Sequence, residues 1–98
     1  MISSPGQVPS AADMGARLAI VELLNCHSRA LDRLDASLMK AVYWPSATVD
    51  YGGFKGEAHV FADLVMGALA GQYQLTQHRV TNTVFEFFND QHAATESL

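Results

Sequence analysis

The feature that most constrains the fold of this chain is a change of hydrophobic pattern at about residue 74. Before it, apolar residues recur at helical spacing, as they do in the segment 57–69. After it, β-branched and aromatic residues dominate, so the run 74–88 predicts a long strand, followed by a turn at Asn89-Asp90 and a returning strand over 92–98. Helices come first and an antiparallel meander follows. This order predicts an α+β fold and not the βαβ alternation of parallel α/β proteins.

The part of the chain before the long strand divides at capping and breaking residues. Asp13 is a good N-cap for a first helix that runs to about Leu31, and Asp35 is suited to cap a short second helix over 36–42. Trp44-Pro45 then ends helical structure, because the residue before a proline avoids the α region. The other expected elements are a short strand over 47–51, a turn at Gly52-Gly53 and a third helix over 57–69.

Length and composition limit the chain to a single small domain. It has 98 residues, of which 49% are hydrophobic, a composition typical of a chain that folds. The proline- and glycine-containing start predicts a flexible tail over 1–11, with the domain over 12–98. A two-stranded hairpin and one short strand are a poor cover for three helices. We therefore expect the sheet to be incomplete in this chain, which would then be the N-terminal portion of a larger domain.

Charge and cysteine usage exclude several classes of partner. The net charge is −4 and no basic block stands out, so the sequence predicts no nucleic-acid partner. No stretch is apolar enough to span a membrane, and the single cysteine, Cys26, indicates a reducing compartment and hence a cytoplasmic protein. The four histidines lack the spacing of metal ligands, so we expect no metal.

The long predicted strand carries the sharpest chemical signal. Side chains alternate along a strand, so His78, Val80 and Asn82 are expected to share one face. An imidazole in an apolar surround can act as a general base near neutral pH, and a carboxylate beside it would fix its tautomer. The strand alone is also compatible with a core histidine that is hydrogen-bonded to backbone, which is the commoner situation.

Three further side chains are candidates for the same site. Asp32 lies in the last turn of the first helix, where the helix dipole disfavours an anion, although a solvated surface aspartate would be equally ordinary. His27 is placed roughly 140° around that helix from Asp32. Tyr51 ends the short strand and could donate a hydrogen bond to a substrate oxygen, or could be an aromatic residue at the sheet rim. Tyr43 is interpreted as a packing residue.

Three segments together resemble a known family. Residues 23–35 include the run Arg-Ala-Leu-Asp with a second aspartate after it, residues 44–56 open with Trp-Pro and close with Gly-Phe-Lys-Gly, and residues 77–82 carry a histidine and an asparagine spaced as His-x-x-x-Asn. In this order and at this spacing they resemble SnoaL-like proteins of the NTF2-like superfamily. Relatives include scytalone dehydratase, bile-acid 7α-dehydratase and polyketide cyclases.

The resemblance implies a fold and a set of site residues. The fold is a cone in which N-terminal helices pack on a curved antiparallel sheet, around a small-molecule pocket. By position, His78 matches the catalytic histidine and Asp32 its partner, while Tyr51 and Asn82 match substrate-binding positions. His27 stands where the family has a tyrosine, which keeps a hydrogen-bond donor but changes its reach and pKa. Members continue with further strands, so the resemblance also implies a C-terminally truncated chain.

Two kinds of function follow from this resemblance. The first is a cofactor-independent lyase or isomerase, similar to a dehydratase, a cyclase or a ketosteroid isomerase, that acts on a small, mostly apolar hydroxy or keto ring compound. The second is a non-catalytic module of the NTF2-like kind that binds a small molecule or dimerises, or else an inactive truncated fragment. Relatives are often oligomers through the sheet, so a homo-oligomer is a possible state.

Overall fold

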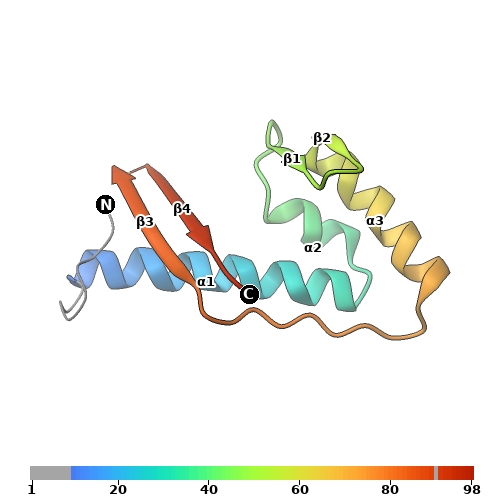
Figure 1. Ribbon diagram of the computed structural model, residues 1–98, viewed down its shortest axis with the longest axis horizontal. Coiled ribbons are helices and arrows are strands. Elements are labelled where there is room, and N and C mark those ends of the chain that lie inside the picture. Colours follow the sequence, from blue (N-terminus) through green and yellow to red (C-terminus); the bar gives the residue numbers. More distant parts are fainter. Residues whose placement is uncertain (1–9, 90) are drawn as a thin grey trace. The chain divides into compact units, whose positions relative to one another are not determined.

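The computed structural model describes residues 10–89 and 91–98, which form two compact units. One unit contains the chain up to Leu24 together with the C-terminal segment from Arg79 onward, and the other spans Asn25–His78. Figure 1 labels their elements, and each unit is described by itself below. The element order is α1 (Ala11–Asp32), α2 (Ala36–Ala41), β1 (Thr48–Asp50), β2 (Lys55–Glu57), α3 (Ala58–Gln72), β3 (Val84–Asn89) and β4 (His92–Glu96).

Helix α1 begins earlier than the sequence predicts. The backbone N–H of Asp13 donates to Ser10 Oγ at 3.1 Å, so Ser10 is the N-cap and Asp13 lies in the first turn, where its charge suits the helix dipole. The predicted N-cap at Asp13 is therefore wrong by three residues. Of the predicted tail, residues 1–9 lie outside the described residues, and Ala11 already belongs to α1.

The end of α1 is set by a left-handed residue. Leu34 has φ 53°, and the backbone N–H groups of Leu34 and Asp35 donate to the carbonyls of Leu31 and Ala30 at 3.3 and 2.8 Å. This pair of bonds is a Schellman motif, which satisfies carbonyls that the last helical turn leaves open. The motif stops the helix just after Asp32 and directs the chain into α2.

Helices α1, α2 and α3 share a small core in the Asn25–His78 unit. Its buried members are Ala30 and Leu31 of α1, Met39 of α2, and Ala62 and Met66 of α3. The alanines allow close approach of the helices, and Met39 fills the space between them with a fully buried side chain. The predicted second and third helices are confirmed, with ends that differ by at most three residues.

Asp35 caps α2 as predicted, because its Oδ1 accepts a hydrogen bond from the backbone N–H of Leu38 at 3.0 Å. Replacing Asp35 by alanine should lower the free energy of unfolding by about 1 kcal/mol, since it leaves that N–H without its acceptor. Urea unfolding followed by far-UV circular dichroism measures the loss. The exposed Ser37→Ala on the same helix is the matched control and should change stability by less than about 0.5 kcal/mol.

Strands β1 and β2 form an antiparallel hairpin that positions Tyr51. Asp50 Oδ1 accepts from the backbone N–H of Gly52 at 3.0 Å, and Gly52 has φ 76°, a conformation that favours glycine. The backbone N–H of Tyr51 donates to the carbonyl of Phe54 at 2.9 Å and closes the turn. Strand β2 was not predicted, because its three residues are too few to show an alternation of apolar and polar side chains.

The predicted long strand over 74–88 is wrong in its first part. Regular β-structure begins only at Val84, and the segment 73–83 contains no helix or strand. Asn82 has φ 54°, which is not a strand conformation, so His78, Val80 and Asn82 do not belong to one regular strand as the sequence predicts. Strands β3 and β4 do form the predicted antiparallel hairpin, with Phe85 opposite Thr95.

In the unit that contains this hairpin, Arg17 of α1 contacts β3. Its guanidinium carbon lies 5.0 Å from the ring centre of Phe85 and 5.5 Å from that of Phe87. The two rings are parallel to within 3°, and Phe85 is buried. A cation over aromatic faces is attracted by their electron density, so this contact holds the hairpin to the first half of α1.

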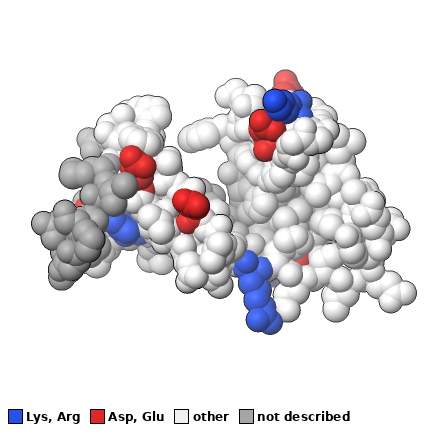
Figure 2. All heavy atoms as spheres, viewed as in Figure 1, with Lys and Arg blue, Asp and Glu red and all other residues white. Residues whose placement is uncertain are grey.

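Helices followed by antiparallel strands confirm the α+β class. The described strands form two separate two-stranded sheets, β1–β2 and β3–β4, and neither is closed. Within the described part of the chain, no helix is long and apolar enough to cross a membrane. On the face shown in Figure 2, charged side chains are few and dispersed.

Candidate active site

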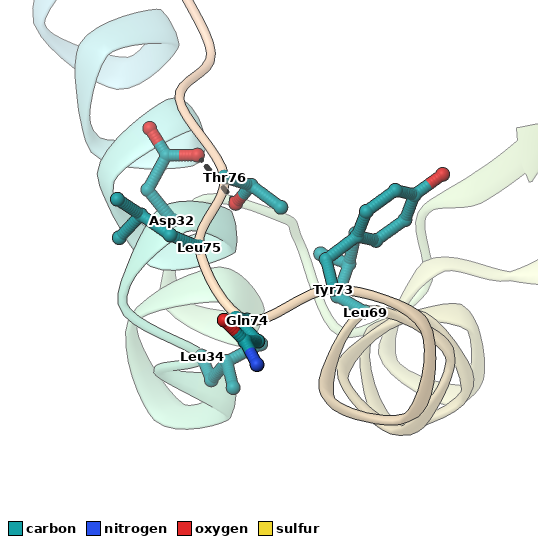
Figure 3. Close-up of a pocket in the computed structure, with 7 residues that line it drawn as sticks. All are labelled: Asp32, Leu34, Leu69, Tyr73, Gln74, Leu75 and Thr76. Atoms are coloured by element: carbon teal, nitrogen blue, oxygen red, sulfur yellow. Dashed lines mark hydrogen bonds between the residues drawn. The ribbon is translucent and has the colours of Figure 1, made fainter.

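Asp32 and His78 form the closest polar contact of the Asn25–His78 unit. His78 Nδ1 lies 2.5 Å from Asp32 Oδ1, and the backbone N–H of His78 donates to Asp32 Oδ2 at 2.8 Å. Thr76 Oγ1 donates to Asp32 Oδ1 at 2.9 Å (Figure 3). One carboxylate thus binds both the backbone and the side chain of His78. The pairing that the resemblance implied is present in the structure.

The segment after α3 supplies the donors that this carboxylate accepts. Asp32 is the last residue of α1, where the helix dipole disfavours a negative charge. Thr76 Oγ1, the backbone N–H of His78 and the His78 ring provide three hydrogen bonds to it. Desolvation would raise the pKa of Asp32, but hydrogen bonds from the His78 backbone, the His78 ring and Thr76 outweigh it and lower the pKa below its usual value.

This lowered pKa predicts an acid-sensitive contribution to stability. The pKa of Asp32 is lower in the folded state than in the unfolded state. Such a carboxyl group stabilises the fold at pH values above its unfolded-state pKa, and this stabilisation is lost as the pH falls through its folded-state pKa. The free energy of unfolding of wild type should therefore exceed that of Asp32→Asn by a constant amount just above about pH 5. This difference should shrink as the pH is lowered from about 5 to about 2. Urea midpoints measured at several pH values test this. The exposed Glu22→Gln should show no such convergence with wild type.

A second polar pair lies in the same unit. His27 Nε2 and the Tyr43 hydroxyl are 3.0 Å apart, and the two rings meet edge to face at 5.8 Å. Burial lowers the pKa of His27, and the positive charge of nearby His78 lowers it further. Both causes disfavour the protonated form of the His27 imidazole.

Tyr43 has more polar contacts than the sequence predicts. Burial raises the pKa of the Tyr43 hydroxyl, and the influence of Tyr51 adds to the effect. The Tyr51 ring stacks on Phe61 of α3 at 4.3 Å, and His59 Nε2 lies 3.3 Å from the backbone carbonyl of Tyr43. The interpretation of Tyr43 as a packing residue is thus incomplete. Nothing in its sequence position signals these contacts, because its partners lie 16 residues earlier and 16 residues later.

A small depression adjoins Asp32, between the ends of α1 and α3 (Figure 3). Its volume is about 20 Å³, which is room for about one water molecule. Leu34, Leu69 and Leu75 supply apolar walls, while Asp32 and Thr76 supply polar atoms. The side chain of His78 is 41% exposed and that of Asp32 is 21% exposed, so the pair is accessible to solvent.

The remaining predicted site residue, Asn82, is part of the other compact unit. Asn82 belongs to the unit formed by the chain ends, whereas Asp32, His78, His27 and Tyr51 all belong to the Asn25–His78 unit. A substrate-binding role for Asn82 stays a prediction. Among residues 10–89 and 91–98, no three His, Cys, Asp or Glu side chains gather closely enough to hold a metal ion.

The chain is an α+β protein, in which helices lead into antiparallel hairpins. A carboxylate–imidazole pair lies at the end of its first helix. The SnoaL-like domain matches residues 12–97, and the chain belongs to this family within the NTF2-like superfamily. No curated protein and no solved structure matched it in the same comparisons.

Proposed function

We propose that this SnoaL-like protein is a cofactor-independent proton-transfer enzyme, a lyase or isomerase that acts on a small, mostly apolar ring ketone. The observation that carries the proposal is the 2.5 Å contact between Asp32 Oδ1 and His78 Nδ1. A hydrogen bond from Nδ1–H to a carboxylate leaves Nε2 of the neutral imidazole as the basic nitrogen. This arrangement suits a histidine that removes a proton from carbon.

The proposed reaction begins at a carbon next to the carbonyl group. His78 Nε2 takes the proton, and the electron pair of the C–H bond moves to the carbonyl oxygen to give an enolate. Asp32 stabilises the imidazolium that forms, since its carboxylate already accepts a hydrogen bond from Nδ1. In a β-hydroxy ketone the enolate then expels the hydroxyl group, which takes the proton from His78 and leaves as water. In a β,γ-unsaturated ketone the electron pair is spread over a dienolate, and the proton returns from His78 to the γ-carbon, which moves the double bond and is an isomerisation.

Tyr51 is proposed to stabilise the enolate oxygen. In this role the Tyr51 hydroxyl donates a hydrogen bond to the enolate oxygen, as donors do in other sites that stabilise developing negative charge. The Tyr51 ring stacks on Phe61, and the residue is 53% exposed, so the hydroxyl group is accessible.

The test of this function is hydrogen exchange on a defined ketone. 2-Tetralone is incubated with the protein in D2O, and loss of its α-proton signals is followed by NMR against a buffer blank. Elimination is followed separately with 3-hydroxycyclohexanone, whose product 2-cyclohexenone absorbs in the ultraviolet. We expect wild type to accelerate α-proton exchange and Asp32→Asn to lose most of that acceleration. Exchange at the buffer rate with wild type would contradict the proposal.

A non-catalytic, ligand-binding module is the second candidate. It is favoured by the depression at Asp32, where Leu34, Leu69 and Leu75 offer apolar contacts and Asp32 and Thr76 offer polar atoms to a ligand. Its signature would be saturable binding of 2-tetralone, measured by ligand-observed NMR, without exchange of the α-protons. The same sample therefore separates the two candidates.

A further inference from the structure

Thr76 and His78 bond to the same oxygen of Asp32. Thr76 Oγ1 lies 2.9 Å from Asp32 Oδ1, and His78 Nδ1 contacts that atom at 2.5 Å. An ionised carboxylate only accepts hydrogen bonds, so the Thr76 hydroxyl donates its single hydrogen to Asp32. The second oxygen, Oδ2, accepts from the backbone N–H of His78 at 2.8 Å. Of these three donors, Thr76 is the one that does not belong to His78.

The bond from Thr76 differs from the bond of the His78 ring in its relation to proton transfer. The proposed reaction protonates and deprotonates the His78 imidazole, so the charge on that ring changes within each turnover. The hydroxyl group of Thr76 takes no part in this step and donates to Oδ1 before and after it. Thr76 therefore holds Oδ1 in place independently of the protonation state of His78.

Threonine is a suitable residue for such a fixed bond. Two heavy atoms on Cβ restrict its χ1 angle, so its hydroxyl group occupies few rotamers. The bond joins residues 44 positions apart and ties the segment after α3 to the last residue of α1. It is partly buried, whereas the His78 side chain is 41% exposed. A hydrogen bond that is shielded from water is electrostatically stronger than an exposed one.

The surroundings of Asp32 make this donor important for its charge. Asp32 ends α1, where the helix dipole disfavours an anion, and leucine side chains line the depression beside it (Figure 3). Desolvation raises the pKa of Asp32, while the hydrogen bonds from His78 and from Thr76 lower it. Thr76 thus favours the ionised form of Asp32, which is the form that pairs with an imidazolium.

We propose that Thr76 is a positioning residue, whose hydroxyl group fixes the Asp32 carboxylate and thereby keeps the His78 ring oriented while His78 takes up and releases a proton. This inference rests on the proposed function for its reaction, but the bond between Thr76 and Asp32 does not depend on turnover. It assigns a role to a side chain that was not among the site residues expected from the sequence.

The bond is tested by the titration of Asp32, followed through the carboxyl ¹³C signals of aspartate-labelled protein from about pH 6 to about pH 2. Asp32→Asn assigns the signal, and far-UV circular dichroism checks that each variant is folded. We expect Asp32 to titrate at a higher pH in Thr76→Val than in wild type, because loss of a donor disfavours the charged carboxylate. Thr76→Ser keeps the hydroxyl group and should titrate like wild type.

The matched control for this titration is Thr48→Val, which makes the same chemical change at an exposed residue of β1. It should leave the titration of Asp32 unchanged. Equal titration of Asp32 in wild type and in Thr76→Val would overturn the proposal.

The positioning role is tested with the 2-tetralone exchange assay. Thr76→Val should lower kcat about 10-fold, less than loss of the general base itself, and change KM less than about twofold. Thr76→Ser should keep a kcat close to that of wild type, because it retains the donor and lacks only a methyl group. If Thr76→Val does not fold, Thr76→Ala, which also lacks the hydroxyl group, is compared with Thr76→Ser instead.

Two kinetic results would contradict the role of Thr76. One is a wild-type kcat for the variant without the hydroxyl group, and the other is a Thr76→Ser variant as slow as that variant. If wild type itself exchanges no α-protons, the proposed function fails, while the titration of Asp32 still decides whether Thr76 holds the carboxylate.

Discussion

Replacement of His78 by alanine is expected to reduce the rate of α-proton exchange by about 10²–10⁴-fold, the usual contribution of a positioned general base. The loss should fall on kcat, because a proton acceptor acts in the transition state and contributes little to ground-state binding. The backbone N–H of His78 still donates to Asp32 after the substitution, so the loop should keep its position. Exchange of 2-tetralone protons in D2O measures the effect.

Two controls distinguish a loss of catalytic activity from a loss of folding. His92→Ala removes a histidine of the other unit and should keep the wild-type rate. Added imidazole should restore part of the activity of His78→Ala, since it can occupy the vacated space and accept the proton. A rate for His78→Ala within twofold of wild type would remove His78 from the proposed mechanism.

Replacement of Met39 by alanine is expected to have the largest effect on stability. Met39 is fully buried among Ala30, Leu31, Ala62 and Met66, so truncation of its side chain would leave a cavity inside this core. Such truncations cost about 2–5 kcal/mol. Because small domains are stable by only about 5–15 kcal/mol, the variant should unfold at much lower urea concentration.

The matched control for this experiment is Leu18→Ala, which removes an apolar side chain of α1 that is 69% exposed. It should change the free energy of unfolding by less than about 0.5 kcal/mol. If Met39→Ala were no more destabilising than Leu18→Ala, the three helices would not share the described core. Met39→Leu, which nearly conserves volume, should cost less than about 1.5 kcal/mol.

The helices were predictable because their signals are local. Asp35 caps α2 as expected, and the apolar spacing of α3 identified that helix to within three residues. The N-cap of α1 was misplaced because Ser10 and Asp13 are both good capping residues, and spacing alone does not rank them. The hairpin of β3 and β4 was predictable from its β-branched and aromatic residues and from the turn residue Asn89.

The segment from 73 to 83 was predicted wrongly for a physical reason. Its residue types favour a strand, but three donors to Asp32 and the left-handed conformation of Asn82 stabilise an irregular path instead. Propensity is a weak preference, and tertiary contacts override it. His78 and Asp32 were nevertheless named correctly as neighbours, because the resemblance to the family carried information that strand periodicity did not.

The class of the fold, the positions of the helices and the family could be predicted from the sequence, since each of these depends on patterns of neighbouring residues. Which side chains meet depends on the tertiary structure. Asp32 and His78 are 46 residues apart, and His27 and Tyr43 are 16 residues apart. Such contacts arise from the directions in which the Leu34 helix end and the Gly52 turn send the chain, and no local pattern encodes them.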